Sequence, residues 1–250
     1  MSQTSDVVWI EGPPGDSAVS AWNALTYKVG DASGDFLKPV FTIEYGSGRA
    51  TQTQLAEAHA NGGLMVTSWS RVGEPAALRH AQFVGGAASR HLFIDRKRQG
   101  DVALLFSIPS IFWRRFSSLT VGAAFAPKGF QFFDYFSGVA RIFEDEHISY
   151  ETLMLHHPDL HWNRTAPCHG GYGRSYPTRY NEFSTIVIAG VDAISDNDIV
   201  LLADFVLGRS GACGAAPTQQ WLKCAGGHLV IVGAAVGSKD EELNPRSAAT

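Results

Sequence analysis

The chain has 250 residues, of which 45% are hydrophobic and 18% are charged, and its formal net charge is −4. This composition is typical of a folded protein with one large domain or two smaller ones, and it lacks the positive charge of nucleic-acid-binding proteins. No membrane-length apolar run, no secretory leader and three cysteines, which leave one thiol unpaired, together predict a cytoplasmic protein with neither a membrane nor a nucleic-acid partner.

The first hundred residues alternate strand patterns with helical patterns. Strands are predicted at 7–12, 38–46 and 63–69, and helices at 18–30, 52–62 and about 74–92. The strand segments are rich in apolar, β-branched and aromatic residues, and the helix over 52–62 ends at Asn-Gly, a common helix stop. This alternation predicts three successive β-α units with parallel strands.

The charged run RKRQGD at 96–101 predicts a boundary between two domains, 1–98 and 99–250. Beyond it, the near-continuous apolar run at 101–107 is typical of a central parallel strand. Further strands are predicted at 150–155, 183–191 and 227–233, and helices at 130–147 and 196–207.

Local signals add detail to the two helices of the second half. In the first, a stripe of apolar residues at helical spacing is expected to face the core: Phe132, Phe136, Val139 and Phe143. Before the second, Ser195 and Asp198 resemble a capping box. The segments 160–180 and 208–221 lack periodicity and are predicted to be inserted surface loops.

The second half resembles a domain found at the C-terminal end of family-42-type β-galactosidases. The resemblance rests on DVALLFSIPSIFWRRF (101–116), YETLMLHHPDL (150–160), STIVIAGVDAISDNDIVLLADFV (184–206) and GGHLVIVGAAVGSKDEELNPR (226–246). That domain is called the β-galactosidase trimerisation domain and has a class I glutamine-amidotransferase-like fold. The resemblance implies a flavodoxin-like, three-layer α/β/α domain with a parallel sheet over 99–250, and a homo-oligomer, with a trimer as one form.

The first half is similar to the last three β-α units of the (β/α)8 barrel that precedes this domain in such hydrolases. VWIEGPPGDSAVSAW, KPVFTIEYG and LAEAHANGGLMVTSW would correspond to strands six, seven and eight with their helices. A complete barrel requires about 250 residues. Residues 1–98 are therefore expected to form an incomplete barrel segment, whose missing part belongs to a longer protein or to another chain.

The resemblance implies one candidate catalytic residue, Glu44, which would be the nucleophile that ends strand seven. Retaining glycosidases need a second carboxylate about 5 Å away as acid/base. In the family that residue ends strand four, which this chain lacks. Without the resemblance, Glu44 reads as a solvated carboxylate at a strand end; Glu11 is on the same rim but has no implied role.

The turn GAAVG at 233–237 follows the last predicted strand. In working amidotransferases this position holds a reactive cysteine, with a histidine partner further along the chain. Here the turn contains no Cys, Ser or Thr, and no histidine follows His228. Amidotransferase or protease activity is therefore not expected. Cys213, in SGACGA, lacks the preceding apolar strand of a nucleophile elbow and is interpreted as a loop thiol.

No metal or cofactor is expected. The most suggestive group contains His156, His157, His161, Cys168 and His169. However, His156 and His157 follow one another at a strand end and would point to opposite faces, and the flanking Gly-Gly-Tyr-Gly favours a loop.

Three functions are compatible with these patterns. The first is the C-terminal portion of a glycoside-hydrolase-like protein that has a structural, oligomerising role and no catalysis alone; its partner is a second copy or the missing barrel half. The second is a retaining, β-galactosidase-like hydrolase acting on carbohydrate through Glu44. The third is an amidotransferase-like module that binds a small ligand near Ser107, Gly190 and Gly233, at the carboxyl ends of its strands.

Overall fold

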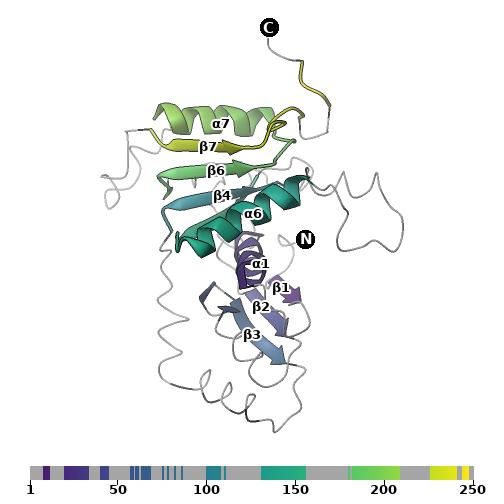
Figure 1. Ribbon diagram of the computed structural model, residues 1–250, viewed down its shortest axis with the longest axis vertical. Helices are drawn as coiled ribbons and strands as arrows, with labels where there is room; N and C mark the ends of the chain where they lie inside the picture. The colour runs from purple at the N-terminus through teal and green to yellow at the C-terminus, as the bar shows by residue number, and fades with distance from the viewer. Residues whose placement is uncertain are drawn as a thin grey trace, which may run out of the picture. The chain divides into compact units, whose positions relative to one another are not determined.

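The structure, a computed structural model, divides the chain into two compact units, Met1–Gln99 and Gly100–Thr250 (Figure 1). It describes residues 8–11, 20–33, 40–44, 63–68, 100–107, 131–155, 182–208, 226–240 and 244–247, together with the single positions 57, 58, 60, 61, 75, 78, 82, 86, 110 and 180.

The first unit contains a parallel sheet with the strand order β1-β2-β3. The strands are β1 (Val8–Glu11), β2 (Val40–Glu44) and β3 (Gly63–Ser68), so neighbours in the chain are neighbours in the sheet. The register between β2 and β3 shifts after Thr42. The three strands lie where the sequence patterns predicted them.

One long helix, α1 (Ser20–Ser33), connects β1 to β2. Ala24, Leu25, Tyr27 and Ala32 of this helix are buried. The sequence pattern predicted that this helix ends at Gly30, and this end is wrong. The helix continues past Gly30, which is buried, and ends at Ser33. A glycine inside a helix weakens it by only about 0.5–1 kcal/mol, less than the surrounding packing contributes.

The other two helices predicted in this unit are described at single positions. Glu57, Ala58 and Ala60 are helical within 52–62, and Pro75, Leu78 and Gln82 are helical within 74–92.

The second unit is an α/β structure built on four parallel strands in the order β5-β4-β6-β7. These are β4 (Val102–Phe106), β5 (Tyr150–Met154), β6 (Thr185–Ala189) and β7 (His228–Val232). The chain enters at β4, moves to β5 on one side, then returns to β6 and β7 on the other. The prediction of an α/β fold with a parallel sheet is confirmed.

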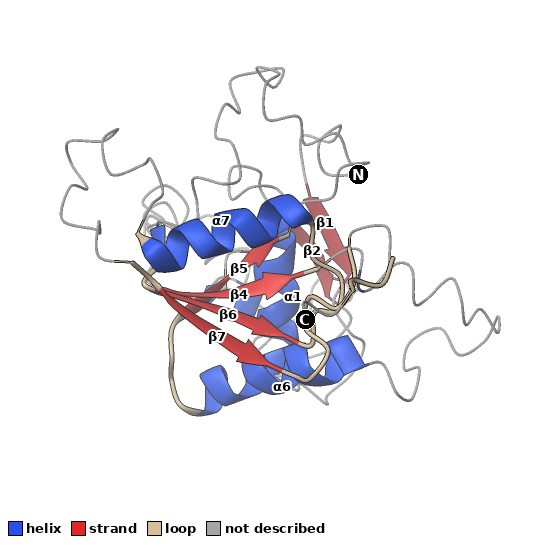
Figure 2. Ribbon diagram, turned by 90° about the horizontal axis from the view of Figure 1, so that it is seen from above, coloured by secondary structure: helices blue, strands red, loops and turns tan. Residues whose placement is uncertain are grey.

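The connecting helices that are described over their full length are α6 (Gln131–Asp145) and α7 (Asp196–Leu207). They belong to crossovers that run in opposite directions along the sheet. Since such crossovers are right-handed in nearly all proteins, the helices should lie on opposite faces. Figure 2 shows this arrangement, with α6 and α7 on either side of the strands.

The core of the second unit includes the predicted aromatic stripe of α6. Phe136, Val139 and Phe143 are buried, as expected, whereas the side chain of Phe132 lies outside the described residues. The Phe136 ring meets Phe106 of β4 edge-on at 5.3 Å between ring centres, and Phe143 contacts Tyr150 of β5 at 5.1 Å. Burial of each such ring stabilises the fold by about 1.5–3 kcal/mol.

Both ends of α7 are capped, and the sequence indicated the cap at the first of them. The Ser195 hydroxyl accepts a hydrogen bond from the backbone N–H of Asp198 at 3.0 Å, and Gly208 ends the helix in the left-handed conformation with φ 65°. The Asp198 carboxylate in turn accepts hydrogen bonds from the hydroxyls of Ser195, at 2.8 Å, and Tyr180, at 3.3 Å. These local signals explain why the predicted helix bounds are correct.

Candidate functional site

The candidate catalytic residue of the first unit lies at the carboxyl edge of its sheet. Glu44 is the last residue of β2 and is in register with Ser68, the last residue of β3. Glu11 ends β1, opposite Ile43. Catalytic groups of barrel enzymes lie at this edge, so the backbone position of Glu44 is compatible with the predicted role. The assignment of Glu44 as a nucleophile stays a prediction.

In the second unit, the carboxyl ends of β4 and β6 form the switch point of the sheet, because the chain leaves these neighbouring strands in opposite directions. Ligands of open α/β sheets bind in the crevice at such a point. A binding site of this unit would therefore lie at the loops that follow the two strands.

A pair of serines joins these two loops. The Ser107 hydroxyl, just after β4, donates a hydrogen bond to the carbonyl oxygen of Ala193 at 3.1 Å, and the Ser110 hydroxyl accepts one from the Ala193 N–H at 3.1 Å. The Ser110 N–H donates to the Ser107 hydroxyl, also at 3.1 Å. Both serines are fully buried. Their hydroxyls join the β4 loop to the β6 loop.

The turn after β7 also packs closely against the β6 loop. Gly233 has φ 117°, and a Cβ atom at this position would lie 3.5 Å from the Gly190 Cα atom. The N–H of Gly237 donates to the carbonyl oxygen of Val191 at 3.0 Å. Ser107, Gly190 and Gly233 thus share the carboxyl edge, as the ligand-binding interpretation required, but they serve there as packing and hydrogen-bonding positions.

The chain beyond this turn runs alongside the β6 loop. The Lys239 N–H donates to the carbonyl oxygen of Asp192 at 3.0 Å, and the Ile194 N–H donates to that of Lys239 at 3.2 Å. The Lys239 ammonium group lies 3.4 Å from the Asp192 carboxylate, whose side chain is only 5% exposed. The backbone pairing and the ion pair together hold the C-terminal segment on the carboxyl edge.

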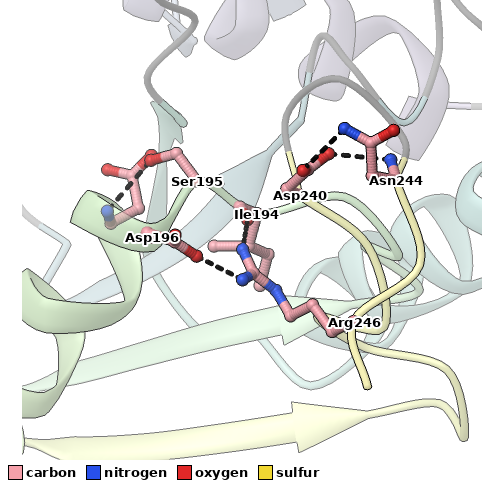
Figure 3. A network of polar contacts seen from close by, with 7 residues as sticks. Ile194, Ser195, Asp196, Asp240, Asn244 and Arg246 are labelled. Carbon is pink, nitrogen blue, oxygen red and sulfur yellow. Dashed lines mark hydrogen bonds and ion pairs between the residues drawn. The ribbon is translucent and has the colours of Figure 1, made fainter.

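Arg246 completes this attachment (Figure 3). Its guanidinium group donates to the carbonyl oxygen of Ile194 and to the carboxylate of Asp196, and its N–H donates to the carbonyl oxygen of Ser238. Within the same segment, Asn244 donates two hydrogen bonds to the Asp240 carboxylate, at 2.8 and 2.9 Å. Sequence reasoning missed this network; the Asp and Asn four residues apart were the available signal of a local turn.

The other sequence candidates lie outside the described residues. These are His156, His157, His161, Cys168, His169 and Cys213. The two predicted insertions also lie outside the described residues, apart from Tyr180 and Gly208 at their ends. Within the described ranges, no three His, Cys, Asp or Glu residues are grouped so that they could hold a metal ion.

No protein-family model and no curated protein sequence matches this chain. In the part of the chain that the structure describes, none of the helices combines the length and the apolar character needed to cross a membrane.

Proposed function

We propose that this chain is the C-terminal portion of a cytoplasmic, glycoside-hydrolase-like protein and that its second unit has a structural role in assembly, without catalysis of its own. The first unit would be derived from the last β-α units of a (β/α)8 barrel. The second would correspond to an amidotransferase-like oligomerisation domain.

The strand order of the first unit supports the barrel origin. In a (β/α)8 barrel, each strand pairs with the strands before and after it in the chain, and all strands are parallel. The order β1-β2-β3 follows this rule, with α1 as the crossover between β1 and β2. Doubly wound sheets, in contrast, reverse direction, as the second unit does at β4.

The observation that carries the non-catalytic role is the attachment of the β6 loop at the switch point. On one side it is bonded to Ser107 and Ser110, and on the other to the segment that contains Lys239 and Arg246. Each of these hydrogen bonds contributes about 0.5–1.5 kcal/mol to stability. The polar side chains of this loop system therefore have structural partners where an enzyme would present reacting groups.

The competing function is a retaining β-galactosidase-like hydrolase that uses Glu44, and a turnover assay separates the two. The full chain is incubated with a chromogenic aryl β-galactoside, alongside Glu44→Gln and the control Glu146→Gln, which alters an exposed residue after α6. We expect no hydrolysis above the background of Glu44→Gln. Turnover by the native chain that Glu44→Gln abolishes and Glu146→Gln retains would establish the hydrolase instead.

A further inference from the structure

The outer face of α7 is apolar. Among the positions of this helix whose side chains are described, the exposed ones are Asp196, Ile199, Val200, Ala203, Val206 and Leu207, and of these only Asp196 is polar. Val200 and Leu207 are 58% and 57% exposed. The inner face includes Leu202 and Phe205, which are also apolar and are buried. A helix that is apolar on both faces is normally covered on both.

Helix α6 of this unit shows the contrast. The exposed positions of α6 include Asp134, Arg141 and Asp145, and Arg141 pairs with Asp145 at 3.6 Å. This is the usual pattern of a helix with one face in water, although Tyr135 and Ile142 are also exposed, at 39% and 57%.

Strand β7 lies at the edge of the sheet as far as the strands are described, beside β6 on one side only. Val230 is 45% exposed and its neighbour Ile231 is 58% exposed. Successive strand residues point to opposite faces, so both faces of this edge are partly exposed. Proteins usually protect an edge strand with a charge, a proline or a bulge. HLVIV contains no Asp, Glu, Lys, Arg or Pro, and its register with β6 is continuous.

The exposed apolar residues of α7 and those on the two faces of the β7 edge are neighbours in the fold, because Phe205 of α7 lies against Gly227, directly before β7. We call these residues together the α7–β7 patch; its large apolar members are Ile199, Val200, Val206, Leu207, Val230 and Ile231. Their exposed fractions amount to about 500 Å² of apolar surface, which is the size of the largest patch on a typical soluble protein, and such patches are often functional. A standard interface buries about 800 Å² per partner and is about 65% apolar in homodimers, which corresponds to the same area.

We propose that a second copy of this chain covers the α7–β7 patch, with β7 pairing antiparallel to β7 of the copy about a two-fold axis. This inference rests on the proposed assembly role and assigns it a surface. An open strand edge supplies N–H and C=O groups that only another strand satisfies in full. An axis perpendicular to the sheet would make one sheet of eight strands and bring the two α7 helices together on the same face.

The sequence of β7 suits such self-pairing. Val230 is the middle residue of the five-residue strand, so a two-fold axis at this point sets it opposite its own copy. An apolar residue is favourable there, whereas any charge would meet a like charge. A two-fold contact of this kind closes after two copies and gives a dimer, not the trimer that the family resemblance allows.

The test uses the full chain and a pair of opposite charges at the axis. Sedimentation velocity at micromolar concentration is measured for the native chain, for Val230→Lys and Val230→Glu separately, and for their equimolar mixture. We expect a dimer for the native chain, single chains for each variant and a dimer for the mixture. Like charges across the interface should weaken association by more than about 10-fold, whereas opposite charges restore it.

A second pair of variants separates a loss of dimerisation from a loss of folding. Leu207→Glu in the patch should weaken the dimer, and Ile142→Glu on α6, where the native side chain is equally exposed at 57%, should not. Circular dichroism is recorded for every variant.

Four results would overturn the inference. A dimer that persists in both Val230→Lys and Leu207→Glu, or a trimer, would place assembly on another surface and leave the assembly role standing. A single native chain would remove the assembly role too, and single chains in the Lys/Glu mixture would exclude the two-fold pairing.

Discussion

Gly227 lies directly against the ring of Phe205: a Cβ atom at Gly227 would stand 1.8 Å from the Phe205 Cζ atom. The contact seats the last turn of α7 on the first residues of β7. Phe205 is only 4% exposed, so moving its ring away from Gly227 would expose apolar surface that is now buried. The close packing of α7 against β7 at this point therefore requires a residue without a side chain at position 227.

Gly227→Ala should consequently destabilise the protein. The added methyl group forces the Phe205 ring or the β7 backbone to move, and overpacking of this kind costs about 1–3 kcal/mol. The control is Gly138→Ala on α6, where no atom lies within 4 Å of the added group. It should stabilise the helix by about 0.5–1 kcal/mol. Urea unfolding of both variants checks the expectation, and equal stabilities would show that the contact at Gly227 is not tight.

Ser195→Ala should destabilise the protein by removing the N-cap of α7. Loss of such a cap costs about 1 kcal/mol, and here the buried Asp198 carboxylate also loses the Ser195 hydroxyl as a donor. Ser195→Thr retains a hydroxyl and should recover most of the loss. The free energies of unfolding from denaturant titration provide the comparison. If the alanine and threonine variants were equally unstable, the hydroxyl would not be the stabilising group.

Ser107 and Ser110 at the switch point should contribute unequally to the free energy of unfolding, and the effects of replacing them should be coupled. Ser107→Ala leaves the buried Ser110 N–H and the Ala193 carbonyl without this partner, whereas Ser110→Ala affects only the Ala193 N–H. Since an unsatisfied buried group costs about 1–3 kcal/mol, Ser107→Ala should be the more damaging change. A double-mutant cycle should show a coupling of about 0.5–3 kcal/mol. Additive effects would mean that the hydrogen bonds do not form one network.

Because the phenol of Tyr150 is buried, we expect the protein to lose stability in alkaline solution. Burial, followed by the negative charges of Glu144 and Glu151, raises the pKa of its phenol well above the ordinary value. The unfolded chain releases this proton at about pH 10, earlier than the folded protein does. The corresponding stability is thus present below pH 10 and is lost as the pH rises further. Tyr150→Phe lacks the ionising group, so its free energy of unfolding should fall less steeply above pH 10; parallel slopes would exclude this role.

The elements that the sequence predicted best are those with local signals. Ser195, Gly208 and the apolar run between them define α7, and helical spacing places Phe136 and Phe143 in the core. Each of these signals lies within a few residues of the structure that it specifies, so no knowledge of the rest of the fold is needed.

The missed features depend on contacts between distant segments. Arg246 binds the carbonyl oxygen of Ile194, 52 residues away, and Ser107 is 86 residues from Ala193. No periodicity indicates that these residues meet. The apolar outer face of α7 could have been read from DNDIVLLADFVL, but a helix buried on both sides in one chain has the same pattern. For Glu44, the sequence predicts the strand end, while a catalytic role requires a second carboxylate that local pattern does not provide.

The molar mass of the native full chain in solution tests the proposed assembly role most directly. Light scattering at micromolar concentration should give twice the chain mass of 27.0 kDa, as a closed two-fold dimer requires. A mass of 27.0 kDa that stays constant as the concentration is raised would show that the chain does not dimerise and has no assembly role of its own.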